Sequence, residues 1–136
     1  MGNPQKINET YLTIIQTNIG RLATTSFLIK GWSVTLVAAI FALAAKDSNS
    51  AFVLIAYFPA IMFWLLDSYF LGMERRFVSM YNAASSGKLN NFEVQPHNFT
   101  TTRASMAGAC YSRTILLFHG SILATILLVM FGISRL

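Results

Sequence analysis

Residues 26–45 read SFLIKGWSVTLVAAIFALAA, residues 46–50 read KDSNS, and residues 51–70 read AFVLIAYFPAIMFWLLDSYF. A helix needs about 20 predominantly apolar residues to cross a hydrocarbon layer about 30 Å thick. Each long segment therefore has the length of one membrane span, and each carries one charge, Lys30 in the first and Asp67 in the second. The five polar residues between them predict a tight turn, so this part of the chain forms a helical hairpin that crosses the membrane twice.

A third apolar segment, residues 114–133, has the length of a span and contains no Asp, Glu, Lys or Arg. Over all 136 residues, 54% are apolar and only 11% are charged, whereas soluble domains carry about 25% charged residues. The single cysteine, Cys110, excludes an intrachain disulfide framework. The sequence therefore predicts an all-α membrane protein with three transmembrane helices.

The segments around the spans predict four regions. Residues 1–25 form an amphipathic cytosolic helix that runs without a break into the first span, because their apolar residues recur at three- and four-residue steps. Residues 26–85 form the hairpin, whose second helix is kinked by Pro59 and extends into the cytosol as far as Ser85. Residues 86–102 form a polar cytosolic loop, and residues 103–136 form a third helix that contains the last span.

The basic residues predict the orientation of these helices. Cytoplasmic loops carry an excess of Lys and Arg close to the ends of the spans. Eight basic residues lie before the first span, near its start, or between the second and third spans: Lys6, Arg21, Lys30, Arg75, Arg76, Lys88, Arg103 and Arg113. Only two lie at the opposite ends of the spans, Lys46 in the hairpin turn and Arg135 after the third span. We therefore expect a membrane protein with a cytosolic N-terminus and a periplasmic or extracellular C-terminus.

Two pairs of opposite charges suggest how the hairpin is aligned. Lys30 lies 15 residues before Ala45, and Asp67 lies 16 residues after Ala51, so both sit at nearly the same depth. Facing residues then have numbers that add up to about 97, and a second pair, Arg21 with Glu74, adds up to 95. An unpaired charge at this depth would be costly, so the sequence predicts an intramembrane pair of Lys30 with Asp67.

The same alignment predicts close packing of the two helices. It places Val37 opposite Ala60 and Phe41 opposite Ala56, so that a large residue meets a small one in each case. Helices in lipid associate by packing of this kind, because small residues let two backbones approach closely.

The role of the Lys30–Asp67 pair stays open at this level. The pair either fixes the alignment of the hairpin or serves as a gate, because intramembrane ionisable residues often mark ion paths. On the second interpretation, Ser33 and His119 are candidates for lining a path. His119 could instead hydrogen-bond across helices, and a packed histidine is the more common case. Arg21 and Glu74 form a salt bridge between the cytosolic extensions of the hairpin, which contributes little by itself.

No motif in the sequence indicates an enzyme or a cofactor. There is no glycine-rich phosphate loop, no carboxylate pair with a histidine partner and no Cys/His metal spacing, so we expect neither catalytic residues nor a metal site. The cytosolic arginines could attract nucleic acid, but the positive-inside rule already explains them, which makes a nucleic-acid partner the weaker interpretation.

The hairpin resembles a group of small bacterial membrane proteins with a Lys-Gly-Trp hairpin and a Pro-x-x-x-Phe-Trp-x-x-Asp return helix. The resemblance covers roughly residues 20–82, and its motifs here are Lys30-Gly31-Trp32 and Pro59 through Asp67. The chain is more loosely similar to the SLATT-type membrane effectors of antiphage systems and to the membrane accessories of such systems, including RADAR. The resemblance implies a homo-oligomer that disrupts the membrane when a cytosolic sensor signals infection.

Three functional hypotheses follow. The first is a homo-oligomeric inner-membrane pore or effector in antiphage defence, since three spans of one chain cannot enclose a water path. The second is a non-conducting membrane anchor that recruits a cytosolic defence protein through residues 75–113. The third is a holin-like protein, although the basic tail typical of holins is reduced here to Arg135. The lipid bilayer and further copies of the chain are the partners that the first hypothesis requires.

Overall fold

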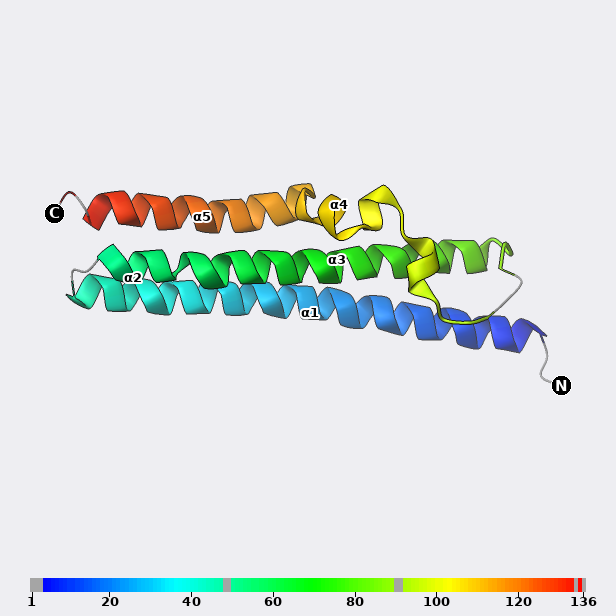
Figure 1. Ribbon diagram of the computed structural model, residues 1–136. Helices are drawn as coiled ribbons and strands as arrows, with labels where there is room; N and C mark the ends of the chain where they lie inside the picture. The colour runs from blue at the N-terminus through cyan, green and yellow to red at the C-terminus, as the bar shows by residue number, and fades with distance from the viewer. Residues whose placement is uncertain (1–3, 48–49, 90–91, 134, 136) are drawn as a thin grey trace.

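The protein is a bundle of long helices that run side by side (Figure 1). The computed structural model describes residues 4–47, 50–89, 92–133 and 135, and these contain helices but no strand. Three helices are long and apolar enough to span a membrane, which confirms the predicted fold class. In chain order, the elements are α1 (Pro4–Asp47), α2 (Ser50–Ile55), α3 (Tyr57–Ser85), the 3₁₀ turns η1 (Pro96–Phe99) and η2 (Thr102–Ala104), α4 (Met106–Cys110) and α5 (Arg113–Ile133).

Helix α1 is a single helix of 44 residues that joins the amphipathic region to the first span. It begins at Pro4, where the fixed φ of proline suits a helix start, and no later proline interrupts it. Its buried residues recur at steps that keep them on one side of the helix: Tyr11, Ile15, Ser26, Ile29, Ser33, Val37 and Ala44. This face packs along α3 over most of its length.

Two clusters of buried side chains hold α1 against its neighbours. Near the N-terminal end of α1, Tyr11 and Ile15 pack with three residues of α3: Phe77, Met80 and Ala84. Toward the hairpin turn, Val37, Ala56 and Ala60 belong to one cluster of buried residues, and the half-buried Phe41 packs against that cluster. The cluster thus combines large and small residues of the two helices, as close packing in lipid favours.

The second helix of the hairpin changes its hydrogen bonding near Pro59, although Ala56 keeps helical backbone angles (φ = −65°, ψ = −23°). Pro59 has no N–H to donate to the carbonyl of Ile55, and its ring pushes that carbonyl aside. The helix accordingly stops at Ile55, turns at Ala56 and resumes at Tyr57, with the amide of Ala60 donating to Ala56 O at 3.3 Å. The proline therefore acts as predicted, but the break lies three residues before it. Positions 48 and 49 of the hairpin turn lie outside the described residues.

Helix α3 ends where the sequence predicts, because Gly87 reverses the chain. Gly87 has φ = 69°, a conformation that favours glycine. Its amide donates to Ala84 O at 3.1 Å, and the amide of Lys88 donates to Ala83 O at 3.0 Å. These two bonds satisfy carbonyls at the helix end in the Schellman arrangement.

The predicted third helix from residue 103 is wrong over its first ten residues. The chain instead forms η2 and the five-residue α4, turns at Tyr111 and Ser112, and starts its last helix at Arg113. The side chain of Ser105 accepts from Gly108 N at 3.0 Å and caps α4. A Cβ atom on Gly108 would lie 2.0 Å from Thr102 O, so only glycine allows this close fold-back of the backbone.

Two arginines of α3 attach this folded segment to the bundle. Arg75 Nη1 donates to Arg103 O at 2.6 Å and to Gly108 O at 3.3 Å, and Arg76 Nε donates to Ala104 O at 3.2 Å. Charged donors make the stronger hydrogen bonds, and carbonyls outside regular helix need such partners. Residues 103–108 are therefore a fixed part of the bundle.

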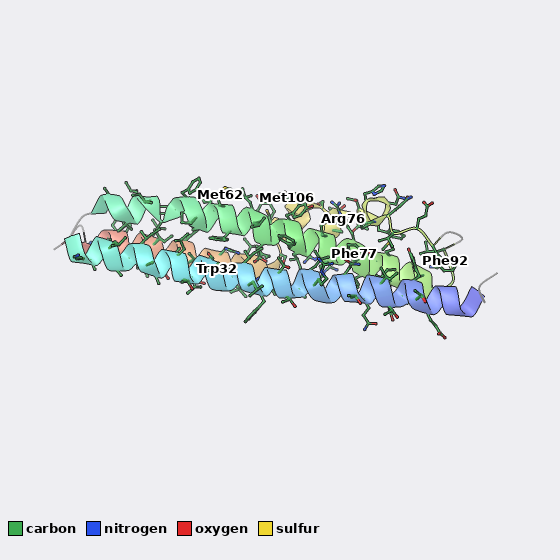
Figure 2. All side chains as sticks on the ribbon, turned by 90° about the horizontal axis from the view of Figure 1, so that it is seen from below. Trp32, Met62, Arg76, Phe77, Phe92 and Met106 are labelled. Carbon is green, nitrogen blue, oxygen red and sulfur yellow. The ribbon has the colours of Figure 1, made fainter. Side chains whose placement is uncertain are left out.

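Different parts of the chain lie at the two ends of the bundle. The N-terminus and the 86–105 segment lie at one end, and the C-terminus and the connection from α1 to α2 lie at the other (Figure 1). Many side chains along the spans point outward, and among those labelled in Figure 2, Trp32 on α1 and Met62 on α3 are 65% and 52% exposed. A membrane location is compatible with these exposed apolar faces.

Candidate functional site

Helix α1 contributes a hydroxyl and an ammonium group one turn apart. Ser26 and Lys30 are four residues apart, so they lie on the same side of the helix. Lys30 Nζ donates to Ser26 Oγ at 2.8 Å. Ser26 is buried and the Lys30 side chain is 25% exposed, so the lysine reaches from the surface of the bundle toward its interior.

Helix α3 contributes a carboxylate with no exposure at all. Asp67 lies between the helices, and Lys30 Nζ is 2.8 Å from its Oδ1 and 2.6 Å from its Oδ2. The hydroxyl of Ser26 also donates to Oδ1. A charge in the hydrocarbon region is tolerated only where it is paired and hydrogen-bonded, and Asp67 meets both conditions from α1 alone.

Helix α5 contributes a third group to the same carboxylate. His119 is 1% exposed, and its Nε2 lies 3.0 Å from Asp67 Oδ2. An ionised carboxylate only accepts hydrogen bonds, so Nε2 carries the hydrogen. His119 Nδ1 is buried and has no hydrogen-bond partner among the described residues.

Aromatic rings surround this polar centre. Trp64 stacks on the imidazole of His119 with ring centroids 6.2 Å apart, and its Nε1 donates to Cys110 O at 3.3 Å. Phe118 packs edge-on against His119, and the ammonium of Lys30 lies 5.9 Å from the centroid of the Phe118 ring. The rings exclude water from the carboxylate and add a cation–π contact to the lysine.

The result is a nearly neutral cluster that joins all three spans through one side chain. Asp67 balances the charge of Lys30 and holds His119 at the same time, so α1, α3 and α5 meet at Asp67. Among the described residues, no group of three His, Cys, Asp or Glu side chains is placed to share a metal ion. The chemistry of the cluster is that of a hydrogen-bonded ion pair with a histidine attached.

Some of the predicted site residues come together and others do not. The structure brings Lys30 to Asp67, as the helix alignment implies, and it adds His119, for which the sequence left both path lining and a hydrogen bond across helices open. Sequence reasoning missed Ser26, although its position one turn before Lys30 was a usable signal. Ser33 and His119 are buried inside the bundle of one chain rather than on a face between copies.

The second predicted pair does not form. No ion pair within 4.0 Å joins Arg21 to Glu74, both of which the structure describes. Arg21 is exposed, next to Leu22 on the packed side of α1, and Glu74 is half-buried on α3. The two residues have matching depths but point in different directions around their helices.

Comparisons with known proteins found no relative from which a function follows. The resemblance to defence-associated membrane proteins stays a prediction. A scan against protein-family models found no matching family, and searches of curated proteins and of solved structures found no similar chain.

Proposed function

We propose that the protein is the subunit of a homo-oligomeric pore that permeabilises the bacterial inner membrane. The observation that carries this proposal is a groove of about 310 Å³ between α1 and α5. The groove lies on the outside of the bundle and holds two hydroxyl side chains, those of Ser121 and Thr125. A second copy can therefore close it into a path that is not purely apolar.

The groove combines small, apolar and hydroxyl residues. Ser121 Oγ donates to Phe118 O at 2.7 Å and Thr125 Oγ1 donates to Ser121 O at 2.8 Å, so both hydroxyls are satisfied and can face either lipid or water. The lining residues are Val34, Val37, Ala38, Phe41, Ser121, Ile122 and Thr125.

Several copies are needed to make a path. Between 17% and 33% of the residues in the most apolar window of each spanning helix are buried within one chain, so most of each span faces outward. Copies related by a rotation axis along the membrane normal would bring equivalent grooves together around that axis. The large apolar residues of α2 and α3 would then face lipid: Leu54, Phe58, Met62 and Leu65.

In this proposal the buried cluster acts as a lock. Separation of α5 from α3 breaks the His119–Asp67 contact, and separation of α1 breaks both contacts of Lys30 with the same carboxylate. The contacts of Asp67 therefore oppose the separation of α3 from α1 and from α5. Such a lock suits an effector that stays closed until a signal arrives.

Oligomeric mass and side-chain accessibility test the proposal. The chain in mild detergent should give a defined native mass of at least four copies. In a Cys110→Ala background, Thr125→Cys should react with a charged thiol reagent in vesicles, and its modification should lower ion flux. Leu127→Cys is the matched control, because Leu127 is 44% exposed and follows Thr125 by two residues, which places it on the other side of the same helix. A monomer, or equal reactivity at both positions, would contradict the pore.

The orientation makes a separate prediction. With the N-terminus in the cytosol, Lys46→Cys should be labelled by an impermeant thiol reagent in intact cells, whereas Lys88→Cys should be labelled only after permeabilisation. Both residues are exposed and lie at opposite ends of the bundle. Cys110 is replaced by alanine in both variants to remove the background. The reverse labelling pattern would invert the topology.

The role in antiphage defence is proposed on the resemblance of the Lys30-Gly31-Trp32 hairpin to membrane effectors of such systems. Cells that carry the protein with its native gene neighbours should become permeable to a small dye during phage infection, before the phage lyses them. Infection without dye uptake would contradict the defence role. It would not contradict the pore, which oligomeric mass and thiol reactivity test separately.

A membrane anchor is the second candidate function. The observation that favours it is the fixed segment on α3, where Arg75 and Arg76 hold residues 103–108 in place. A rigid surface outside the spans is suited to recruit a cytosolic protein. Co-purification of such a partner with a monomer or dimer, without ion flux, would favour the anchor.

A further inference from the structure

A basic pocket lies where the fixed segment meets the last spanning helix. It has a volume of about 580 Å³, and three of its lining residues are arginines: Arg75, Arg103 and Arg113. The remaining lining residues are Gly108, Tyr111, Ser112 and Thr114. The pocket thus combines three guanidinium groups from α3, from η2 and from the first turn of α5.

The positive charge of this pocket is only partly balanced by the described residues. Glu74 interacts electrostatically with Arg75, whereas Arg103 and Arg113 are exposed and no described carboxylate lies within 4.0 Å of either of their guanidinium groups. The charges of Arg103 and Arg113 therefore favour an anionic ligand. Arginine is well suited to bind phosphate, because its planar fork donates two parallel hydrogen bonds.

The walls of the pocket are fixed before any ligand arrives. Arg75 donates from Nη1 to the carbonyls of Arg103 and Gly108, which are both pocket residues. Ser112 Oγ and Thr114 Oγ1 are 3.1 Å apart, and their bond uses one hydroxyl hydrogen, which leaves the other as a donor. The first turn of α5 adds the positive end of a 21-residue helix.

The surroundings of the pocket indicate where the phosphate comes from. Arg113 and Leu117 are four residues apart on α5, and Leu117 is 75% exposed. Leu128 and Phe131, 72% and 59% exposed, continue the same side of the helix along the span. A ligand with an anionic head and an apolar chain would contact both the pocket and this exposed face, whereas a soluble phosphate would contact the pocket alone.

We propose that the pocket of Arg75, Arg103 and Arg113 binds a phosphate group, and that its natural source is the headgroup of an anionic phospholipid. Basic pockets beside spanning helices bind such headgroups in other membrane proteins. The site is separate from the buried Asp67 cluster and from the proposed pore, so it can be tested without an oligomer or a conductance.

Lipid binding by the full chain in mild detergent tests the site. Native mass spectrometry should show that phosphatidylglycerol binds more tightly than zwitterionic phosphatidylcholine. The double variant Arg103→Gln/Arg113→Gln should weaken the binding of phosphatidylglycerol by about 25-fold, or about fivefold for each arginine, and should leave phosphatidylcholine unchanged. Arg75 is left in place because it holds the backbone of the pocket.

Arg21→Gln is the matched control. Arg21 is exposed at the same end of the bundle but lies outside the pocket, so its loss removes a charge and should leave lipid binding unchanged. Equal lipid binding by the double variant and the unaltered chain, or equal weakening by Arg21→Gln, would overturn the proposal. Binding of millimolar inorganic phosphate without lipid, lost in the double variant, would support the phosphate site and assign it to a soluble ligand. Circular dichroism of each variant checks that it folds.

Discussion

Replacement of Asp67 by alanine is expected to lower the free energy of unfolding by about 3–5 kcal/mol, the usual cost of removing one partner of a buried ion pair. Asp67 is fully buried and accepts hydrogen bonds from Ser26, Lys30 and His119. Its loss leaves the ammonium group with Ser26 Oγ as its hydrogen-bond acceptor but without a counter-charge, and it leaves the imidazole N–H without its acceptor. Unfolding by denaturant in detergent micelles, followed by the circular dichroism of the helices, measures the change.

A matched control and a double variant separate the ion pair from general damage to the core. Ser33→Ala removes a buried hydroxyl that has no hydrogen-bond partner among the described residues, one turn from Lys30, and should leave the stability nearly unchanged. Lys30→Met combined with Asp67→Ala should cost less than the sum of the two single changes. Additive effects would show that Lys30 and Asp67 do not depend on each other, which would contradict the lock.

A charge swap is a weaker test than the double variant. Lys30→Asp with Asp67→Lys keeps the ion pair, but it places an ammonium group where Ser26 and His119 now donate their hydrogen bonds. We therefore expect the swap to recover only part of the folded yield. Position 67 needs a hydrogen-bond acceptor because three side chains donate to it, those of Ser26, Lys30 and His119.

Replacement of Gly108 by alanine is expected to cost about 3 kcal/mol, at the upper end of the usual cost of overpacking. The added Cβ would lie 2.0 Å from Thr102 O and 3.1 Å from Arg103 Cα, and both are backbone atoms that cannot move aside by a change of rotamer. The segment that Arg75 holds on α3 should then loosen. Thermal unfolding measures the loss, and faster cleavage by trypsin after Arg103 reports its location.

Gly120→Ala is the control for this change. Gly120 lies in the middle of α5, and a Cβ atom there would meet nothing within 4 Å. In a helix interior, alanine is favoured over glycine by up to about 1 kcal/mol, so this variant should be as stable as the unaltered chain or more so. A loss of stability at Gly120 equal to that at Gly108 would contradict the close backbone contact at Gly108.

The sequence predicts positions along the helix axes better than positions around them. The rise of a helix is constant, so the depths of Lys30 and Asp67 follow from counting residues from the turn, and the structure has them in contact. Arg21 and Glu74 also have matching depths, but the packed face of α1 turns Arg21 outward. The rotation of each helix about its own axis depends on which residues pack against the other helices. This packing is determined by the whole bundle.

The third helix could not be predicted for a related reason. Ala104, Gly108 and Ser112 have the four-residue spacing of a helix face, and the sequence contains no proline between them. The break between α4 and α5 depends on the cap formed by Ser105 and on the approach of Gly108 to Thr102. The contact of His119 with Asp67 depends in turn on where α5 begins and how it is rotated. These are three-dimensional contacts that a spacing pattern does not contain.

Helix α1 is long enough to connect the region outside the spans with the buried Asp67. Its 44 residues form a rod of about 66 Å, more than twice the thickness of the hydrocarbon layer. At one end Tyr11 is held by Glu93 O at 3.0 Å, and near the middle Ser26 and Lys30 are attached to Asp67. Because no break lies between these points, α1 connects its aqueous end to Asp67 as one continuous helix. The neighbouring helix lacks this continuity, since Pro59 removes a backbone hydrogen bond between α2 and α3.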